Sequence, residues 1–227
     1  MKKHAIIVAG GKGLRMKGEI PKQFIALAGK PILMRTIEAF VHYDTNINIV
    51  LVLPETQIPF WQNLCEKCNF SQQYTIAKGG ETRFHSVKNG LALIDSEGLV
   101  AVHDGVRPLV SYATIERCFA AAAEHHAVVP VVDCIDSIRQ IINTESVAVE
   151  RAMFKLVQTP QVFDVQLLKN AYQQTFSPTF TDDASVVESF GTKIYLVEGN
   201  RENIKITTAF DLKIADILSV SGKRRTT

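Results

Sequence analysis

The stretch IIVAGGKGLRMKGEIPKQF, residues 6–24, decides the fold class of this 227-residue chain. It begins within an apolar run, Ala5–Ala9, whose short length predicts a buried strand. Three glycines follow at once: Gly10, Gly11 and Gly13. Glycine lets a ligand approach the backbone closely, and successive free N–H groups form a concave anion site. Together with Arg15 and Lys22, the stretch predicts a strand and a glycine loop that hold a phosphate-rich ligand.

This loop differs from the two better-known phosphate-binding loops. A dinucleotide fingerprint needs G-x-G-x-x-G, but Met16 stands where the third glycine would fall. A P-loop needs Ser or Thr after Gly-Lys, and here Gly13 follows Lys12. The missing third glycine argues against an NAD-dependent oxidoreductase. On the glycines alone, a strand-to-helix turn with solvated charges stays open as the alternative.

Apolar, β-branched runs alternate with amphipathic segments along the chain. We expect strands at Ala5–Ala9, Ile47–Leu53, Tyr74–Ala77, Leu99–Val102, Ala127–Val132 and Lys193–Val197. We expect helices at Ile32–Tyr43, Gln57–Cys68, Arg83–Ile94, Tyr112–His125, Val165–Thr175, Asp183–Phe190 and Ala209–Ser219. This alternation predicts a single α/β domain over residues 1–227, with a mostly parallel sheet flanked by helices. Ligands of such sheets bind beyond the carboxyl ends of the strands, where the glycine loop and Asp104 fall.

The segment Asp136–Val157 breaks the alternation. Its pattern predicts a β-hairpin of two strands around the polar turn Asn143–Ser146. An isolated two-stranded hairpin is marginally stable in water, so it needs a second surface to pack on. We therefore predict that residues 136–158 form a projecting arm that mediates dimerisation. A hairpin folded onto its own domain is the alternative.

Composition argues against several classes of function. The net charge of +2 gives no electrostatic footprint for nucleic acid. The apolar run after Lys2-Lys3 is shorter than the ~7–15 residues of a secretory signal core, and no stretch reaches the ~20 apolar residues of a membrane span. We therefore expect a cytoplasmic protein with no membrane or nucleic-acid partner. Cys65 and Cys68 form a C-x-x-C without a second close pair, so we expect ordinary thiols and no metal site.

The full string A-G-G-x-G-x-R-M, followed by P-K-Q-F, resembles nucleotidyltransferases that join a sugar or polyol phosphate to a nucleoside triphosphate. The P-K-Q points to the cytidylyltransferase branch, and within it to the family of 2-C-methyl-D-erythritol 4-phosphate cytidylyltransferases. Further motifs of that family recur in order over about residues 4–219. They are GGETR with Ser86, HDGVRP, TPQ, TDDAS and NIK, which begin at Gly79, His103, Thr159, Thr181 and Asn203.

The resemblance implies a Rossmann-like nucleotidyltransferase fold and a reaction. A phosphate oxygen of methylerythritol phosphate would attack the α-phosphorus of CTP, giving CDP-methylerythritol and pyrophosphate for non-mevalonate isoprenoid synthesis. That phosphate is already a nucleophile, so catalysis needs positioning and charge stabilisation rather than a general base. The implied cofactor is Mg²⁺ or another divalent cation, held mainly by the substrate phosphates. In this family the arm interlocks with a second subunit, which implies a homodimer.

The resemblance also implies roles for individual residues. Arg15 and Lys22 would stabilise the transition state, whereas Arg151 and Lys205 would position the attacking phosphate. The nucleotide would be bound by the two glycine turns and their neighbours: Ala9, Gly10, Gly11, Gly13, Gly79, Gly80, Glu81, Ser86 and Asp104. The acceptor would be bound by Asp104, Arg107, Ser137, Arg151 and Thr159. Asp104 could bind a ribose or polyol hydroxyl or help to hold Mg²⁺.

The chain departs from the family pattern at four places. Gly10 replaces a common alanine, and Leu14 stands where a second arginine is frequent. Gly105-Val106 replaces a small-residue pair, and Ser137 stands near a threonine that touches the polyol phosphate. None of these differences removes a cationic residue that the resemblance assigns to the site, but they leave the identity of the acceptor substrate open. Ribitol-5-phosphate cytidylyltransferase, which shares the fold, loop and arm, is the nearest alternative. A non-catalytic nucleotide-binding module is a second alternative, which the retained cations disfavour.

Overall fold

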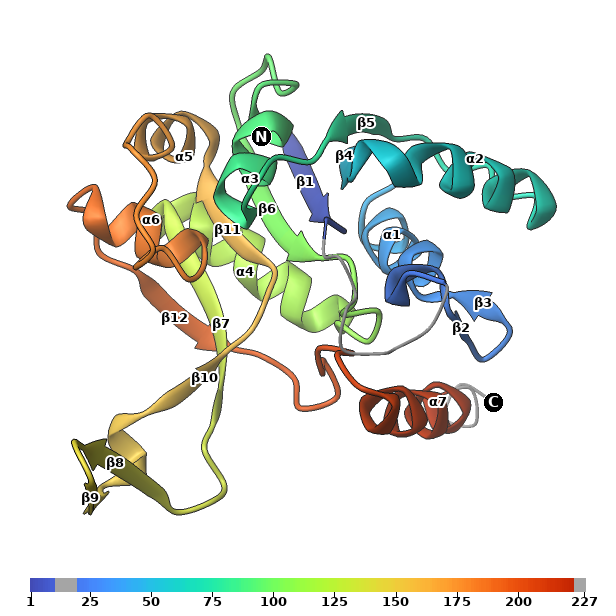
Figure 1. The fold of residues 1–227 in the computed structure, drawn as a ribbon. Helices are drawn as coiled ribbons and strands as arrows, with labels where there is room; N and C mark the ends of the chain where they lie inside the picture. The colour runs from blue at the N-terminus through green and yellow to red at the C-terminus, as the bar shows by residue number, and fades with distance from the viewer. Residues whose placement is uncertain (11–19, 223–227) are drawn as a thin grey trace.

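The computed structural model describes residues 1–10 and 20–222, with side chains as far as Ser219. Three residues of the predicted phosphate loop, Gly11, Gly13 and Arg15, therefore lie outside the described residues. Across the described part of the chain, a central sheet carries helices on both faces (Figure 1). No helix found there is both long and apolar enough to cross a membrane.

The sheet is mixed, and its parallel part holds the carboxyl edge that the sequence predicts. Its strands are β1 (Lys3–Val8), β4 (Asn48–Leu53), β5 (Thr75–Lys78), β6 (Leu99–Asp104), β7 (Ala127–Asp133), β10 (Lys155–Val157), β11 (Gln161–Asp164) and β12 (Tyr195–Glu198). Within the described residues the sheet has eight strands in the order β10-β7-β11-β6-β1-β4-β5, with β12 also paired to β7. All the predicted strands are present with slightly shifted ends. The antiparallel strand β11 was not predicted, and β10 was predicted only as the end of the second strand of the arm, not as a strand of this sheet.

The predicted helices are also present, some of them shorter than expected. They are α1 (Ile32–Tyr43), α2 (Ile58–Lys67), α3 (Arg83–Leu91), α4 (Tyr112–His125), α5 (Val165–Ala171), α6 (Asp183–Ser189) and α7 (Ala209–Gly222). Helices begin where a polar side chain satisfies a free backbone N–H. Ser111 caps α4 in this way, and Asp182 and Ser185 form a capping box that starts α6.

Alternation of side chains along the strands divides the core between the two faces of the sheet. Ile7 of β1 packs with α1, α2 and α4, whereas the next-door Ile6 packs with α3, α5 and α6. A smaller cluster, which includes Ile206 and Ala215, joins α7 to a short hairpin of β2 (Ala26–Leu27) and β3 (Lys30–Pro31). Helices therefore cover both faces of the sheet.

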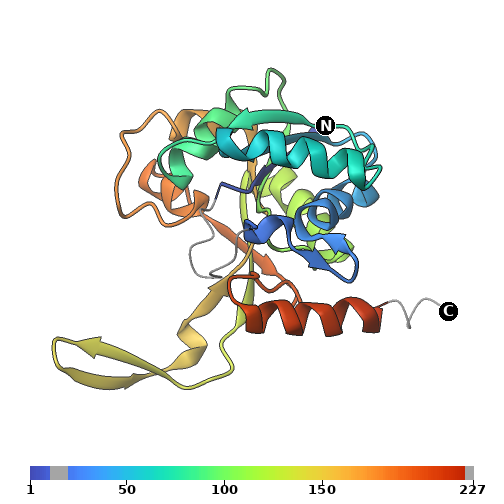
Figure 2. The same cartoon turned by 45° about the vertical axis from the view of Figure 1, so that its right-hand side comes forward.

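The predicted arm is a hairpin of β8 (Ile138–Ile142) and β9 (Glu145–Val149), and both ribbon views show it extending away from the sheet (Figures 1 and 2). Its predicted second strand is wrong in one respect. Arg151 lies in a short 3-10 helix, η4 (Arg151–Met153), and the chain then rejoins the main sheet as β10. Residues after Val149 therefore belong to the base of the arm, because they pair with β7 rather than with β8.

Candidate active site

A cavity of about 610 Å³ lies at the carboxyl ends of the parallel strands β1, β4, β5 and β6. Segments from distant parts of the chain line it: Val8–Gly10, Lys22, Gln23, Pro54–Thr56, Gly79–Arg83, Ser86, Asp104, Val106, Lys205 and Thr207. Three of these segments, Val8–Gly10, Pro54–Thr56 and Gly79–Arg83, lie at the carboxyl ends of β1, β4 and β5. The sheet thus places most of the predicted nucleotide-binding residues around one hollow: Ala9, Gly10, Gly79, Gly80, Glu81, Ser86 and Asp104.

The turn after β5 requires glycine for steric reasons. A Cβ on Gly80 would lie 2.4 Å from the Cβ of His85, so any larger residue would displace the start of α3. The amide of Gly80 donates to Ser86 Oγ at 3.0 Å, and this hydroxyl keeps its own proton to donate. A Cβ on Gly10 would meet Ser86 Oγ at 3.5 Å, an ordinary contact. The serine therefore lies between the two predicted glycine turns.

Lys22 reaches the cavity from the 3-10 helix η2 (Lys22–Phe24), which the neighbouring Gln23 anchors. The Gln23 amide is buried and donates to the carbonyl of Ala9 at 3.1 Å and to Gln57 Oε1 at 2.5 Å. One side chain therefore ties η2 to the end of β1 and to the start of α2. The P-K-Q motif places a cation at the cavity and fixes it with the glutamine beside it.

Asp104, the last residue of β6, is the centre of charge in the cavity. Its Oδ2 lies 3.0 Å from Lys205 Nζ and 3.1 Å from Arg107 Nε, and its Oδ1 lies 4.0 Å from Arg83 Nε. Burial alone would raise the pKa of this carboxyl. The three cations outweigh burial and hold the pKa well below its usual range. Asp104 is therefore ionised, and it gathers cations from three separate segments.

Arg107 also fixes the segment that carries Lys205. Its Nη1 donates to the carbonyl of Asn203 at 2.7 Å, and the amide of Ile206 donates to the carbonyl of Val106 at 3.0 Å. Lys205 itself is partly exposed and lines the cavity. The predicted acceptor residue Arg107 thus acts, within this chain, as a link between β6 and the Asn203–Lys205 motif.

Behind Asp104, a buried network leaves Thr159 with no hydroxyl for a ligand. Thr159 Oγ1 accepts from the amide of Asp104 at 3.1 Å and lies 2.9 Å from His103 Nδ1, while His103 Nε2 lies 3.0 Å from the carbonyl of Arg107. That carbonyl can only accept, so the network assigns the proton to Nε2 and leaves Nδ1 to accept from Thr159. Burial lowers the pKa of His103 to about 4, which keeps the ring neutral. Thr159 was predicted to bind the acceptor; here it supports the backbone of Asp104.

Sequence reasoning missed an ion pair at the wall of the cavity between the partly buried Arg83 and the fully buried Asp183. Arg83 Nη2 donates to Asp183 Oδ2 at 2.6 Å, and the hydroxyl of Tyr172 donates to Asp183 Oδ1 at 2.6 Å. Burial would lower the pKa of Arg83, but Asp183 outweighs it and raises the pKa above its usual value. The motifs GGETR and TDDAS contain these residues, yet neither motif alone indicates that they meet across the fold.

The predicted arm residues do not reach this cavity within one chain. Arg151 lines a separate hollow at the base of the arm, with Cys134, Lys155 and Arg201 among its neighbours, and its guanidinium donates to the carbonyl of Ile135. Ser137 lies exposed just before β8. A single chain therefore brings Lys22 and Lys205 together and leaves Arg151 and Ser137 apart from them.

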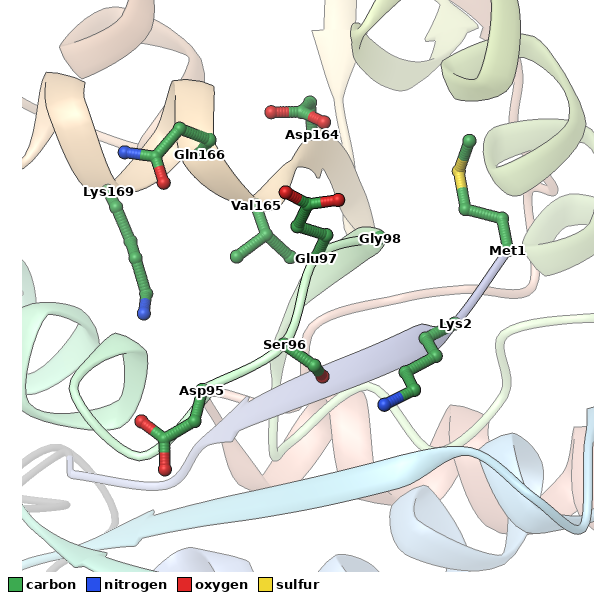
Figure 3. A pocket seen from close by; sticks show the side chains of 10 residues that line it. All are labelled: Met1, Lys2, Asp95, Ser96, Glu97, Gly98, Asp164, Val165, Gln166 and Lys169. Atoms are coloured by element: carbon green, nitrogen blue, oxygen red, sulfur yellow. The ribbon is translucent and has the colours of Figure 1, made fainter.

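Another hollow lies at the opposite edge of the sheet, where β1 and β6 begin (Figure 3). Its volume is about 680 Å³, and Lys2, Glu97, Asp164 and Lys169 are among its lining residues. In Figure 3 these side chains spread around an open hollow and do not converge on one group.

The described residues show no candidate metal site outside the cavity either. Among them, no group of three or more His, Cys, Asp or Glu side chains is placed to hold a metal ion. Cys65 and Cys68 are free thiols, and burial raises the pKa of Cys65.

The sheet, the glycine turn beside Ser86 and the cations at the carboxyl edge define a nucleotidyltransferase. The family model described as 2-C-methyl-D-erythritol 4-phosphate cytidylyltransferase matches residues 3–220, and the chain belongs to that family. A Phocaeicola vulgatus protein of that name is 60% identical over 218 residues, which cover 96% of this chain and 100% of the relative. One from Porphyromonas gingivalis is 48% identical over 222 residues, covering 97% of this chain and 99% of the relative.

Solved structures support the same assignment. The crystal structure of the Francisella tularensis 2-C-methyl-D-erythritol 4-phosphate cytidylyltransferase matches with a TM-score of 0.79 and 32% identity, covering 96% of this chain and 99% of the other. A 4-diphosphocytidyl-2C-methyl-D-erythritol synthase from Anaerococcus prevotii matches with a TM-score of 0.81 and 29% identity, over 96% and 98% of the two chains. The predicted family, enzyme class and fold class are therefore confirmed.

Proposed function

We propose that the carboxyl-edge cavity binds CTP and transfers its cytidylyl group to 2-C-methyl-D-erythritol 4-phosphate, giving CDP-methylerythritol and pyrophosphate. The observation that carries this proposal is the cluster of cations around Asp104, beside a glycine turn, in a chain of this family. Two polyanions must meet for this reaction, and cations preorganised in a cavity lower the electrostatic cost of that meeting. The family assignment does not favour the ribitol phosphate alternative.

The cations would divide the work between the two substrates. Lys22, together with Arg15, would face the triphosphate and stabilise the charge that develops on the α-phosphate and the leaving pyrophosphate. Lys205 would hold the attacking phosphate, because it lines the same cavity on a segment fixed by Arg107. The attacking oxygen displaces pyrophosphate directly, so no side chain has to accept a proton. In this scheme the chain acts by placing charge.

Mg²⁺ fits this arrangement as an ion held mainly by the phosphates of CTP. The Asp104 carboxylate could contribute an oxygen ligand, and it lies at the carboxyl edge of the sheet, where the cavity is. Its Oδ1 lies 4.0 Å from Arg83 Nε, which is beyond hydrogen-bond distance and leaves that oxygen able to accept from a Mg²⁺-bound water. The ion would supply charge neutralisation of the phosphates.

The glycine turn after β5 is the proposed cytosine site. Backbone groups of Gly79 and Gly80 border the cavity, and the Ser86 hydroxyl behind them keeps one proton to donate. Cytosine presents both donors and acceptors on its edge, which fixed backbone groups can match. Glu81 follows in the same turn and lines the cavity. The turn is therefore the feature that would separate CTP from other nucleotides.

The test is release of pyrophosphate with each of CTP, UTP, ATP and GTP, combined with either methylerythritol phosphate or ribitol 5-phosphate. We expect turnover with CTP and methylerythritol phosphate, and its loss in EDTA. Equal rates with all four nucleotides would contradict the cytosine site. Faster turnover with ribitol 5-phosphate would transfer the assignment to the alternative acceptor, and full activity in EDTA would contradict the role of Mg²⁺.

The predicted acceptor-binding residues on the arm are the reason for proposing a homodimer. Arg151 and Ser137 lie on or beside the arm, away from the cavity of their own chain. Large apolar side chains at and near the arm are exposed in a single chain: Ile135, Ile141, Ile142, Val147, Met153 and Phe154. Burial of such side chains against a second copy would stabilise the dimer and would bring Arg151 to the partner's cavity. A cytoplasmic location is also part of the proposal.

Mixed dimers test this assignment. Arg151→Ala and Lys22→Ala should each inactivate the homodimer. If Arg151 acts across the interface, a heterodimer of the two variants has one site with both wild-type residues, and we expect it to recover activity at that site. No recovery in verified heterodimers would mean that the arm serves its own chain, and a monomeric wild-type protein would contradict the dimer altogether.

A further inference from the structure

A buried carboxylate connects the second helical face of the sheet to the candidate active site. Asp183, the first residue of α6, is fully buried, and it accepts hydrogen bonds from Tyr172 and from Arg83 Nη2, both at 2.6 Å. Burying a charge is costly unless it is paired and hydrogen-bonded, and here both oxygens have a donor. The consequence for Arg83 is that one end of its guanidinium is fixed in place.

The other end of the same guanidinium faces the cavity. Arg83 Nε lies 4.0 Å from Asp104 Oδ1, while Arg107 and Lys205 both contact Asp104 Oδ2. The Asp104 carboxylate therefore lies between a cation on one oxygen and two cations on the other. The close contacts of Arg107 and Lys205 hold Oδ2, and the charge of Arg83 favours the rotation of the carboxylate that keeps Oδ1 toward the guanidinium. The position of the Lys205 ammonium follows that rotation.

The charges show why Asp183 matters to this arrangement. Arg83 without a partner would be a full positive charge close to Asp104 and would compete with Lys205 for it. Asp183 neutralises Arg83, so that Arg83 orients Asp104 without drawing it away. Arginine suits this role because its planar guanidinium carries separate N–H groups: Nη2 donates to Asp183, while Nε stays within ion-pair distance of Asp104. Lysine, a point charge, cannot hold both positions at once.

We propose that Arg83, held by Asp183 and Tyr172, is a positioning residue that sets the orientation of Asp104 and, through it, the place of Lys205. The inference rests on the proposed function, since it assigns the three residues to cytidylyl transfer. Arg83 acts through Asp104 and Lys205 rather than on the reacting atoms. Asp183 and Tyr172, both away from the reacting groups, then influence turnover.

A double-mutant cycle tests the proposal, with Asp183→Asn, Asp104→Asn and the double variant. At saturating CTP we expect Asp183→Asn to lower kcat/KM for the acceptor about 10- to 100-fold, as misplacement of reacting groups does. In the Asp104→Asn background the same change should cost no more than about twofold, because the residue through which it acts is already altered. If the two substitutions lower kcat/KM independently, so that their fold-losses multiply in the double variant, the proposal is wrong.

Two further variants keep the test informative if Asp183→Asn folds poorly. Tyr172→Phe removes one donor to Asp183, and Arg83→Lys keeps the charge without the fork. Both should lower kcat/KM in the wild-type background and not in the Asp104→Asn background. Activity of Arg83→Lys equal to that of wild type would also overturn the proposal, since a point charge would then suffice.

Gln174→Ala is the matched control for packing. Gln174 Nε2 bonds the carbonyls of Ala171 and Val186, both at 2.9 Å, so its loss loosens α5 against α6 without touching Arg83. We expect a lower Tm and an unchanged kcat/KM. If Gln174→Ala lowers kcat/KM as much as Asp183→Asn at equal loss of Tm, the network is only structural.

The cycle can also be measured without turnover, as the affinity of each variant for inorganic pyrophosphate by calorimetry. We expect Asp183→Asn to weaken binding, and this effect to fall within about twofold in the Asp104→Asn background. An inactive wild type with such coupling would contradict the proposed function alone. An active wild type without coupling would contradict the positioning role alone.

Discussion

The two hollows at opposite edges of the sheet are similar in size, about 610 Å³ at the carboxyl edge and about 680 Å³ at the amino edge, and differ in how their charges are held. At the carboxyl edge, Arg83, Arg107 and Lys205 converge on the buried Asp104. At the amino edge, Lys2, Glu97 and Lys169 spread around the hollow without a common centre (Figure 3). Size alone therefore does not separate a binding site from a surface hollow; fixed, converging charge does.

The difference follows from the topology. β1, β4, β5 and β6 are parallel, so the segments that follow them all start at one edge and bring residues distant in sequence together. The amino edge receives the ends of incoming connections, such as Gly98 before β6. An additional Cβ on Gly98 would meet the carbonyl oxygen of Lys2 at 2.2 Å, and its φ is +134°. Glycine there serves a tight connection, whereas Gly80 borders the carboxyl-edge cavity.

The largest expected effect separates lysines at the two edges. Lys22→Ala and Lys205→Ala should each lower kcat about 10²- to 10³-fold, because each removes one preorganised charge. Arg15→Ala carries the same expectation from the sequence. Lys2→Ala at the amino edge should change kcat by no more than about twofold, as surface substitutions do. Steady-state kinetics with CTP and methylerythritol phosphate measure all four.

Thermal melts complete that comparison. Lys22 lines the cavity, so Lys22→Ala should leave Tm close to that of wild type. Lys205→Ala removes one partner of the buried Asp104 and should lower Tm modestly, because Arg107 and Arg83 remain beside that carboxylate. A large loss of turnover in Lys2→Ala, with normal turnover in Lys205→Ala, would reverse the two edges and contradict the assignment.

A smaller effect concerns the buried histidine at each edge. Burial lowers the pKa of His103 to about 4 and also lowers that of His4. In the unfolded chain each histidine is protonated below pH ~6.5. In the folded chain the same histidine stays neutral until the pH reaches its lower pKa, so protonation favours the unfolded state. Stability is therefore greatest above pH ~6.5 and falls as the pH decreases toward 4. For His103 the loss at pH 5 is about 2 kcal/mol, or about 4–8 °C in Tm.

Melts of wild type, His103→Gln and His4→Gln between pH 7 and 5 measure this effect. Glutamine can still donate to the carbonyl of Arg107 but does not titrate, so His103→Gln should have the flattest pH dependence. His4, which contacts Asn48 and Ser96, should contribute with the same sign. An equal slope of Tm against pH in wild type and His103→Gln would contradict the neutral, buried ring.

Most of the fold could be predicted because apolar runs of sufficient length report directly on strands and helices. The exceptions are β10 and β11, of three and four residues, which are too short for their periodicity to be distinctive. β11 enters antiparallel between β6 and β7, and no local pattern encodes that choice of neighbours. The position of Arg151 in η4 was mispredicted for a related reason, since a 3-10 helix of three residues is too short to give a recognisable period.

The candidate site shows the same division. Asp104 could be predicted because it ends an apolar strand at the ligand-binding edge, and Ser86 because it follows a glycine turn. Arg83 and Asp183 could not, since they are 100 residues apart and only the tertiary fold brings them together. The contact of the Thr159 hydroxyl with the buried His103 could not be predicted either, because the motif gives no sign of it.

Hydrogen–deuterium exchange with and without CTP and Mg²⁺ tests most directly whether the carboxyl edge is the ligand site. We predict slower exchange in peptides that cover Gly79–Glu81 and Asp104–Arg107, and unchanged exchange over Asp95–Gly98 and Val165–Lys169. Lys205→Ala serves as the matched variant and should reduce the protection at Asp104–Arg107. Protection confined to Asp95–Gly98, with none at Gly79–Glu81, would place the nucleotide at the amino edge and contradict the account.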